Sequence, residues 1–169
     1  MVGLENGTLL PLMESFYTLQ GEGYHKGSAA YFIRLGGCDI GCHWCDVKES
    51  WNSKLHPHTN VSDIVSNAKK YCDTVVVTGG EPLMWNMDPL CKALHQLAIR
   101  IHIETSGAYL ISGSWDWFCL SPKKNKPPLE KAYENADELK MIIYNKDDLK
   151  FAEQQADNVN GECKLFLQP

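Results

Sequence analysis

Three of the seven cysteines, Cys38, Cys42 and Cys45, lie within a single short stretch of the chain. Their spacing is Cys-x3-Cys-x2-Cys, so the three thiolates can bind one metal centre without ligands from distant parts of the sequence. A [4Fe–4S] cluster normally has four cysteine ligands. Three ligands leave one iron of such a cluster free to bind a small molecule. The triplet therefore indicates an iron–sulfur centre that takes part in chemistry.

Inert packing and structural zinc are the two alternatives for this triplet. Isolated cysteines are usually buried and unreactive, and four others each stand alone in an apolar stretch: Cys72, Cys91, Cys119 and Cys163. Structural zinc usually has four ligands arranged as two pairs, whereas this sequence has a triplet without a second pair. His43 directly follows Cys42 and is poorly placed to bind the same ion. Both alternatives fit the spacing less well than an iron–sulfur cluster does.

The composition is that of an ordinary globular domain. The 169 residues suffice for one domain with a hydrophobic core, and the hydrophobic and charged fractions, 44% and 22%, are typical of soluble proteins. The net charge of -5 argues against broad nucleic-acid binding, which needs a basic surface. We find neither a secretory signal nor an apolar run long enough to span a membrane. Together with the seven cysteines, this predicts a reduced, cytoplasmic protein.

Strands that alternate with short helices predict an α/β fold with a parallel sheet. The expected strands are residues 29–35, 74–78, 100–105, 115–120, 139–144 and 164–167. The expected helices are residues 63–71, 89–97 and about 146–158. Residues 1–11 are expected to be a loose lead-in and residues 12–23 a loop, because Gly21 and Gly23 flank Glu22. Six strands are too few to close an eight-stranded barrel.

Polar residues follow the carboxyl ends of several expected strands. They are Cys38, Thr78 with Glu81, Glu104, and Ser121 with Lys123. Because parallel strands bring these ends to one edge, where α/β proteins place their chemistry, we expect these residues to share a site. Arg34 is a lone charge in an apolar strand, so it needs a partner or faces a polar cavity. Gly79 and Gly80 allow a ligand to approach the backbone closely.

The cysteine spacing, with an aromatic residue just before the last cysteine, resembles the signature of the radical S-adenosylmethionine (SAM) superfamily. Six motifs together resemble the 7-carboxy-7-deazaguanine synthase family, over most of the chain from about residue 13. They are Tyr17-Thr18-Leu19-Gln20-Gly21-Glu22-Gly23, Arg34 ahead of Gly36-Gly37-Cys38, Cys42-His43-Trp44-Cys45-Asp46, Thr78-Gly79-Gly80-Glu81-Pro82, Glu104-Thr105-Ser106-Gly107 and Ser121-Pro122-Lys123. The first of these motifs is much more specific to the family than the cysteine triplet is.

The resemblance implies an abbreviated partial (β/α) barrel of about six parallel strands. The implied reaction converts 6-carboxy-5,6,7,8-tetrahydropterin to 7-carboxy-7-deazaguanine and ammonia, in queuosine and deazapurine biosynthesis. The implied ligands of a [4Fe–4S] cluster are Cys38, Cys42 and Cys45. The implied SAM contacts are Gly79, Gly80, Glu81, Ser121 and Lys123. The implied contacts of the pterin are Gln20, Glu22, Arg34, Thr78 and Glu104.

The resemblance also implies Mg²⁺, an electron donor such as flavodoxin or ferredoxin, and a homodimer. Family members hold Mg²⁺ with a Thr or Ser directly after the Cys-Asp pair, whereas Val47 stands here and offers no side-chain oxygen. They also usually continue past the sequence Leu-Gln-Pro. We therefore expect one radical SAM domain over residues 1–169, truncated at its C-terminus.

Two other functions remain open at this point. The cysteine triplet also suits a different radical SAM enzyme, such as a glycyl-radical activase, although Arg34 and the loop with Gln20 and Glu22 argue against it. A non-enzymatic zinc module is the second alternative. Metal content and the response of SAM cleavage to the carboxypterin distinguish these three functions.

Overall fold

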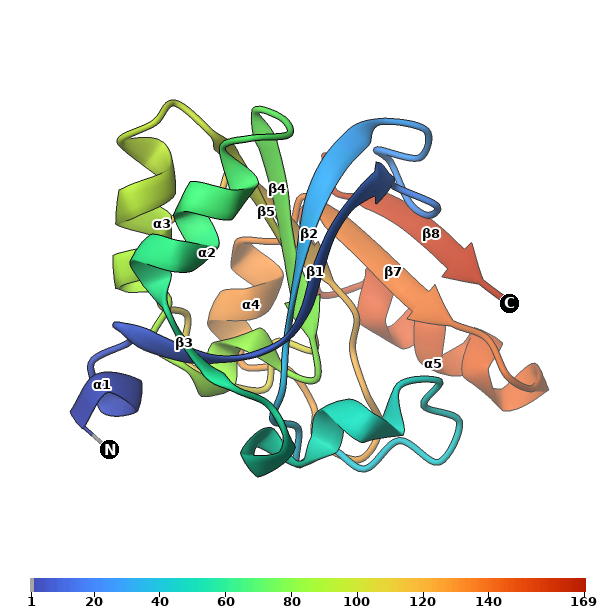
Figure 1. The fold of residues 1–169 in the computed structure, drawn as a ribbon. Coiled ribbons are helices and arrows are strands. Elements are labelled where there is room, and N and C mark those ends of the chain that lie inside the picture. The colour runs from blue at the N-terminus through green and yellow to red at the C-terminus, as the bar shows by residue number, and fades with distance from the viewer. Residues whose placement is uncertain (1) are drawn as a thin grey trace.

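The computed structural model describes residues 2–169, which form an eight-stranded sheet and five α-helices (Figure 1). The strands are β1 (Leu9–Leu19), β2 (Ala29–Leu35), β3 (His58–Asn60), β4 (Thr74–Gly79), β5 (Arg100–Thr105), β6 (Trp117–Leu120), β7 (Glu138–Ile142) and β8 (Lys164–Gln168). The helices are α1 (Val2–Glu5), α2 (Val61–Ala68), α3 (Asp88–His95), α4 (Glu130–Glu134) and α5 (Lys146–Ala156). The order of strands in the sheet is β3-β1-β2-β4-β5-β6-β7-β8.

The six strands from β2 to β8 in this order pair in parallel, as the alternation of strands and helices predicts. β2 and β5 have the predicted bounds, and the other four begin or end within a few residues of them. The predicted helices form α2, α3 and α5. The fold class is confirmed as an α/β partial barrel, because the sheet is mostly parallel and does not close on itself.

The prediction for the N-terminal segment is wrong for residues 9–19, whereas residues 20–23 form a loop as predicted. In place of a lead-in and a loop, Leu9–Leu19 forms the longest strand of the sheet, antiparallel to β2. The short strand β3 pairs with its other edge. Much of β1 is exposed or half-buried, so its polar and apolar residues follow no simple alternation. Backbone pairing with β2 and stacking of Phe16 on Phe32 therefore decide its structure.

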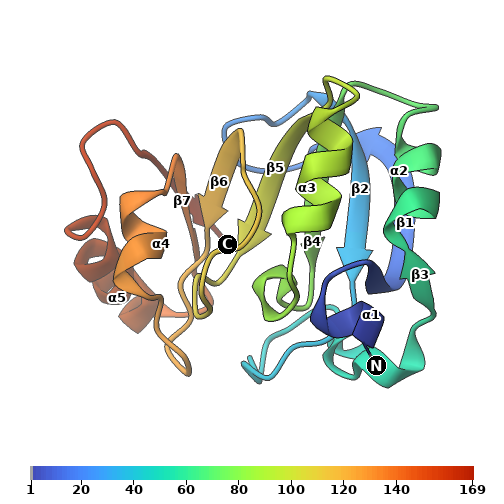
Figure 2. The same ribbon diagram turned by 90° about the vertical axis from the view of Figure 1, so that its left-hand side faces the viewer.

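The two faces of the sheet differ, because successive side chains of a strand point to opposite faces: one face packs in the main core, and the other carries a small apolar cluster around Phe32 and Val76 as well as polar residues. On β4, Val75 and Val77 pack in the main core with Ile64 of α2 and Leu90 of α3. On β5, Ile101 and Ile103 belong to the same core. Figure 2 views the sheet from the side that these helices cover.

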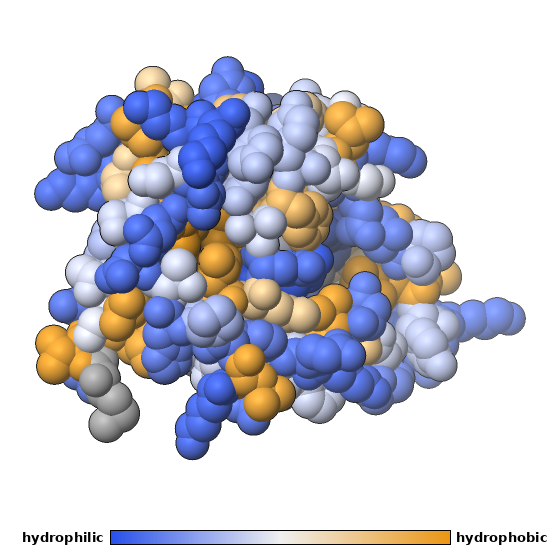
Figure 3. Space-filling model, in the orientation of Figure 1, coloured by the Kyte–Doolittle hydropathy of each residue, from blue (hydrophilic) through white to orange (hydrophobic). Residues whose placement is uncertain are grey.

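Four polar residues at the carboxyl ends of the strands lie on the other face of the sheet. They are Arg34 of β2, Thr78 of β4, Glu104 of β5 and Lys140 of β7, and all four line one cavity. On the face drawn in Figure 3, hydrophilic residues cover much of the surface, with scattered apolar patches between them. In residues 2–169, no helix is both long and apolar enough to cross a membrane.

Candidate active site

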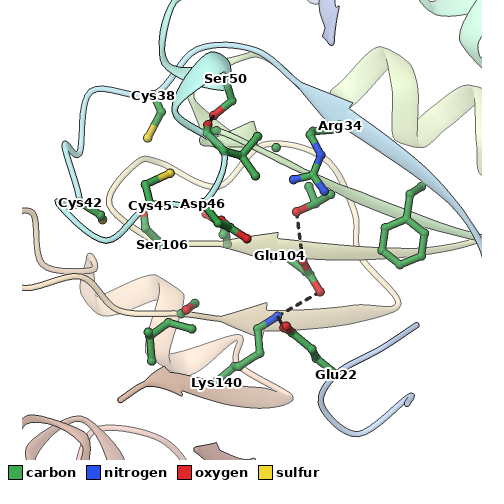
Figure 4. A pocket seen from close by; sticks show the side chains of 18 of the residues that line it. Glu22, Arg34, Cys38, Cys42, Cys45, Asp46, Ser50, Glu104, Ser106 and Lys140 are labelled. Carbon is green, nitrogen blue, oxygen red and sulfur yellow. Dashed lines mark hydrogen bonds and ion pairs between the residues drawn. The ribbon is translucent and has the colours of Figure 1, made fainter. Parts of the chain in front are cut away.

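A cavity of about 400 Å³ opens over the polar face of the sheet (Figure 4). Twelve of the thirteen residues predicted from the sequence line it: Gln20, Glu22, Arg34, Cys38, Cys42, Cys45, Thr78, Gly79, Gly80, Glu104, Ser121 and Lys123. They come from strands far apart in the sequence and from the loops that follow β1, β2, β4 and β6. The three cysteines lie at one end of the cavity, and Glu22, Glu104 and Arg34 lie at the other.

The cysteine loop follows β2 and is held by backbone hydrogen bonds. The Gly37 amide donates to the Ser50 carbonyl at 2.6 Å, and the Cys45 amide donates to the Cys42 carbonyl at 3.1 Å. All three cysteines are free thiols and half-buried. Within residues 2–169, no three His, Cys, Asp or Glu side chains are grouped so as to hold a metal ion. The loop therefore brings the thiols to one cavity without closing them around a single point.

The donor set of this loop suits an iron–sulfur cluster. Thiolate sulfur is the ligand that such clusters take from proteins. Burial raises the pKa of the Cys38 and Cys42 thiols, so metal binding at these residues must displace their protons.

Gly79 and Gly80 are required by the close packing of the β4 loop against the cysteine loop. Gly79 has a φ of +141°, and a Cβ there would lie 2.2 Å from the Leu35 carbonyl oxygen. A Cβ on Gly80 would lie 2.4 Å from the Gly37 carbonyl oxygen and 2.8 Å from the Cys38 Cβ. Any larger residue would push the cysteine loop away, so these glycines bring backbone of the cavity wall next to Cys38.

Glu81 is the predicted site residue whose side chain does not line the cavity. Its carboxylate is buried and accepts hydrogen bonds from the Thr105 hydroxyl at 2.5 Å and from the Leu83 amide at 3.0 Å. It also accepts from the backbone amide of Ser106 at 2.8 Å and from the Ser106 hydroxyl. Glu81 thus ties the loop after β4 to the end of β5, and its contact with SAM stays a prediction.

Glu104 is the centre of a hydrogen-bond network at the other end of the cavity. Its Oε1 accepts from Gln20 Nε2 at 3.0 Å and from Lys140 Nζ at 3.2 Å, and its Oε2 accepts from the Thr78 hydroxyl at 3.0 Å. Burial opposes ionisation of this carboxyl, but Lys140 and the three hydrogen bonds hold its pKa below the ordinary value. Glu104 is therefore an ionised acceptor.

Lys140 is the functional residue that the sequence reasoning missed. Its side chain is 9% exposed, and its Nζ also lies 3.0 Å from Glu22 Oε2. Burial alone would lower the pKa of Lys140, but Glu104 and Glu22 raise it above the ordinary value. The sequence pattern that indicated Arg34 also applies to Lys140, because each is a lone cation inside an apolar strand.

Arg34 meets both expectations that its position raised. Its Nε donates to Glu14 Oε1 at 2.7 Å across the β1–β2 pair, where the two residues lie opposite each other. Its side chain also lines the cavity. Because only Nε contacts Glu14, the guanidinium retains N–H groups for a ligand.

Ser121 and Lys123 lie together between the cysteine loop and the end of β6. Lys123 Nζ donates to the Ser121 carbonyl oxygen at 2.5 Å and contacts the Ser121 hydroxyl at 2.6 Å. It also lies 5.6 Å from the centre of the Trp44 ring. Burial lowers the pKa of Lys123 to about 8. This pair forms a polar wall beside the cysteines.

Comparison with a family model places the chain in a known class. The model of the radical SAM superfamily matches residues 32–116, a range that contains the cysteine loop, β4 and β5. The fold, the cysteine-lined cavity and this match define a radical SAM enzyme. A [4Fe–4S] cluster and SAM are the cofactors of this class.

Three similar proteins identify the family within this class. A 7-carboxy-7-deazaguanine synthase of Flavobacterium psychrophilum is 65% identical over 99% of this chain and 80% of its own length. One from Synechocystis is 47% identical over 94% of this chain and 76% of its own length. The crystal structure of QueE from Escherichia coli has a TM-score of 0.85 and 30% identity, and the match covers 99% of this chain and 86% of that one. The chain therefore belongs to the 7-carboxy-7-deazaguanine synthase family.

Proposed function

We propose that this chain is a radical SAM lyase that converts 6-carboxy-5,6,7,8-tetrahydropterin to 7-carboxy-7-deazaguanine with release of ammonia, in queuosine biosynthesis. The observation that carries the proposal is one cavity with two chemically different ends (Figure 4). Free thiols suited to a cluster line one end, and hydrogen-bond acceptors with a guanidinium group line the other.

The thiol end is the site for the cofactors. Cys38, Cys42 and Cys45 would hold the cluster, and SAM would lie beside it against the residues that line the adjoining wall: Gly79, Gly80, Ser121 and Lys123. When bound, the cluster and SAM supply radical chemistry. The two glycines let the backbone after β4 lie next to Cys38, where SAM would contact it, and Lys123 supplies a cation near the SAM carboxylate.

The acidic end suits the pterin. The terminal N–H groups of Arg34 would pair with the substrate carboxylate, because the guanidinium fork matches a carboxylate in two hydrogen bonds. Glu22 and Glu104 would accept hydrogen bonds from the 2-amino group and the ring N–H. Gln20 and Thr78 already hold the Glu104 carboxylate in place. These contacts would hold the reacting carbon of the substrate within about 3–3.5 Å of its reaction partner.

Mg²⁺ is part of this proposal, bound mainly by substrate and water, because Val47 has no side-chain oxygen. The neighbouring Asp46 lines the same cavity and offers a carboxylate, the kind of ligand that Mg²⁺ prefers. Turnover by the full chain, with and without Mg²⁺ and with Asp46→Asn, tests this point. Full turnover without Mg²⁺ would contradict it.

The proposal also includes a reduced flavodoxin or ferredoxin as electron donor, a cytoplasmic location and a homodimer. The exposed leucines of the edge strand β8, Leu165 and Leu167, support an association of copies, since each is 58% exposed. Size-exclusion chromatography with light scattering tests the dimer, and a monomer at micromolar concentration would contradict it.

SAM cleavage measured anaerobically, with and without the carboxypterin, tests the proposed function. We expect cleavage to depend on the carboxypterin and to be lost in Cys42→Ala, while Cys72→Ala, whose thiol lies outside the cavity, retains it. Cleavage that ignores the carboxypterin would favour a different radical SAM enzyme. One zinc per chain, without iron or sulfide, would favour the zinc module.

A further inference from the structure

Lys140 is the cation that joins the two acids at the pterin end of the cavity. Its Nζ lies 3.0 Å from Glu22 Oε2 and 3.2 Å from Glu104 Oε1. Figure 4 shows it between these two side chains, and Glu104 comes from β5 while Glu22 follows β1. On the basis of the proposed function, we propose that Lys140 is a positioning residue that holds the Glu22 and Glu104 carboxylates together as two acceptors for the donor edge of the pterin.

The arrangement leaves both acids able to accept further hydrogen bonds. None of the residues 2–169 donates to Glu22 Oε1, and Glu104 Oε2 accepts only from the Thr78 hydroxyl. Each carboxylate oxygen has two lone pairs, so acceptor positions remain on both acids. A pterin presents its 2-amino and ring N–H groups side by side. Two carboxylates that contact the same ammonium group match that donor edge.

Other charged groups around this pair do not replace Lys140. The titratable neighbours on the surrounding elements are His25 after β1, His102 of β5, Cys119 of β6, Glu138 of β7, Lys123 after β6 and Arg34 of β2. The two cations among them have other partners, since Arg34 pairs with Glu14 and Lys123 with Ser121. Lys140 is the cation whose ammonium group contacts both acids.

Loss of the lysine charge should make pterin binding depend on pH. Without Lys140, burial and the nearby Glu22 charge would raise the pKa of Glu104, so Glu104 would bind a proton as the pH falls. A protonated carboxyl group presents a donor where the pterin also presents donors. Pterin binding by a Lys140→Met variant should therefore weaken as the pH falls, whereas the native chain should show little change between about pH 8 and pH 6.

The test uses the full chain with its cluster reconstituted anaerobically, and measures the dissociation constants of the carboxypterin and of SAM. For Lys140→Met we expect pterin binding about tenfold weaker than in the native chain at pH 8 and weaker still at pH 6, with SAM binding little changed. Lys140→Arg should restore much of the affinity, because it keeps the charge. Lys164→Met on the neighbouring strand β8, where the lysine is exposed, is the matched control and should behave as the native chain.

Native affinity and an unchanged pH profile in Lys140→Met would overturn the inference. A loss of pterin and SAM binding together, at every pH, would also overturn it, because this would indicate a merely structural role. If Lys140→Met does not fold, the double variant E22Q/K140M is tested in its place. It removes the repulsion between the two acids and leaves Glu104 as the single carboxylate without its cation. Recovery of the fold at about pH 6 would support the inference, and continued failure to fold would overturn it.

A measurement without substrate separates this inference from the proposed function. The unfolding temperature of Lys140→Met should rise, relative to that of the native chain, as the pH falls from about 8 to 6, because protonation of Glu104 then stabilises the folded variant. If the native chain binds no carboxypterin but this shift is present, the proposed function fails while the role of Lys140 toward the two acids stands. If the shift is absent, the inference fails.

Discussion

The Glu81 carboxylate accepts a hydrogen bond from the backbone amide of Ser106 at 2.8 Å, which joins the loop after β4 to the end of β5. The same carboxylate binds Thr105 and the amide of Leu83. These hydrogen bonds thus fix the carboxyl ends of β4 and β5 relative to each other. The backbone of Gly80, one residue before Glu81, is held against the cysteine loop by this arrangement.

Removal of the Glu81 carboxylate should destabilise the fold. Glu81→Ala leaves several buried donors without an acceptor, so we expect the free energy of unfolding to fall by about 2–4 kcal/mol. Urea unfolding measures this change. Glu153→Ala on the exposed surface of α5 is the control, and its effect should stay within about 0.5 kcal/mol. Equal effects of the two substitutions would show that the Glu81 contacts are not important for stability.

Two glycines of the loop between β1 and β2 provide a matched pair. Both have positive φ, +68° at Gly23 and +87° at Gly27, but a Cβ on Gly23 would lie 2.0 Å from Glu138 Oε1 while one on Gly27 would meet nothing within 4 Å. Gly27→Ala should cost only about 1–2 kcal/mol from backbone strain. Gly23→Ala should cost more and also displace the loop with Gln20 and Glu22, so pterin binding should weaken.

Calorimetric titration with the carboxypterin and thermal unfolding of both variants check this prediction. Similar losses in stability and in pterin affinity for Gly23→Ala and Gly27→Ala would show that the loop does not depend on its contact with Glu138.

Arg34→Lys should impair recognition of the substrate carboxylate. Lysine keeps the charge but loses the planar fork and the Nε contact with Glu14. We expect the KM for the carboxypterin to rise about tenfold or more, with SAM binding little changed. Arg100→Lys, at the opposite end of the sheet, is the control. A normal KM in Arg34→Lys would remove Arg34 from the substrate site.

Stability should fall in mildly acidic solution because of His102. Burial first, and then the charges of His25 and Arg100, lower the pKa of His102 from 6.5 to about 4. Between these two values the unfolded chain binds a proton that the folded chain does not, so stability decreases as the pH falls through this window. The contribution is about 1–3 kcal/mol.

His102→Gln should flatten the pH dependence of the free energy of unfolding between about pH 6.5 and pH 4. Urea unfolding at several pH values measures it, with His58→Gln, an exposed residue of β3, as the control. The same slope in the native chain and in His102→Gln would contradict the assignment.

The parallel strands and the cysteine loop could be predicted from local sequence, because β2, β4 and β6 are mainly apolar runs that end in glycine or polar residues. β1 could not, since its structure depends on pairing with β2 and its side chains are only partly buried. The direction in which the Glu81 side chain points could not be predicted from the sequence either. The sequence shows only that Glu81 follows Gly80. The hydroxyl of Thr105 and the amide of Ser106, which come from another strand, determine where the Glu81 carboxylate points.

Lys140 shows a different limit of sequence reasoning. The apolar run of β7 contains this one lysine, so its position was visible, but its partners come from β5 and from the loop after β1. Only the parallel sheet, with its alternating faces, brings Lys140 and Glu104 to the same side. The two acids were predicted as pterin contacts, and the cation that holds them together became visible in the folded chain.

Product formation tests the central claim most directly. The chain, with its cluster reconstituted anaerobically and supplied with SAM, Mg²⁺ and a reductant, is incubated with 6-carboxy-5,6,7,8-tetrahydropterin, and the products are identified by mass spectrometry. We predict 7-carboxy-7-deazaguanine and ammonia in equal amounts, and neither product with Cys42→Ala. Recovery of the carboxypterin unchanged, from a preparation whose cluster cleaves SAM, would contradict the account.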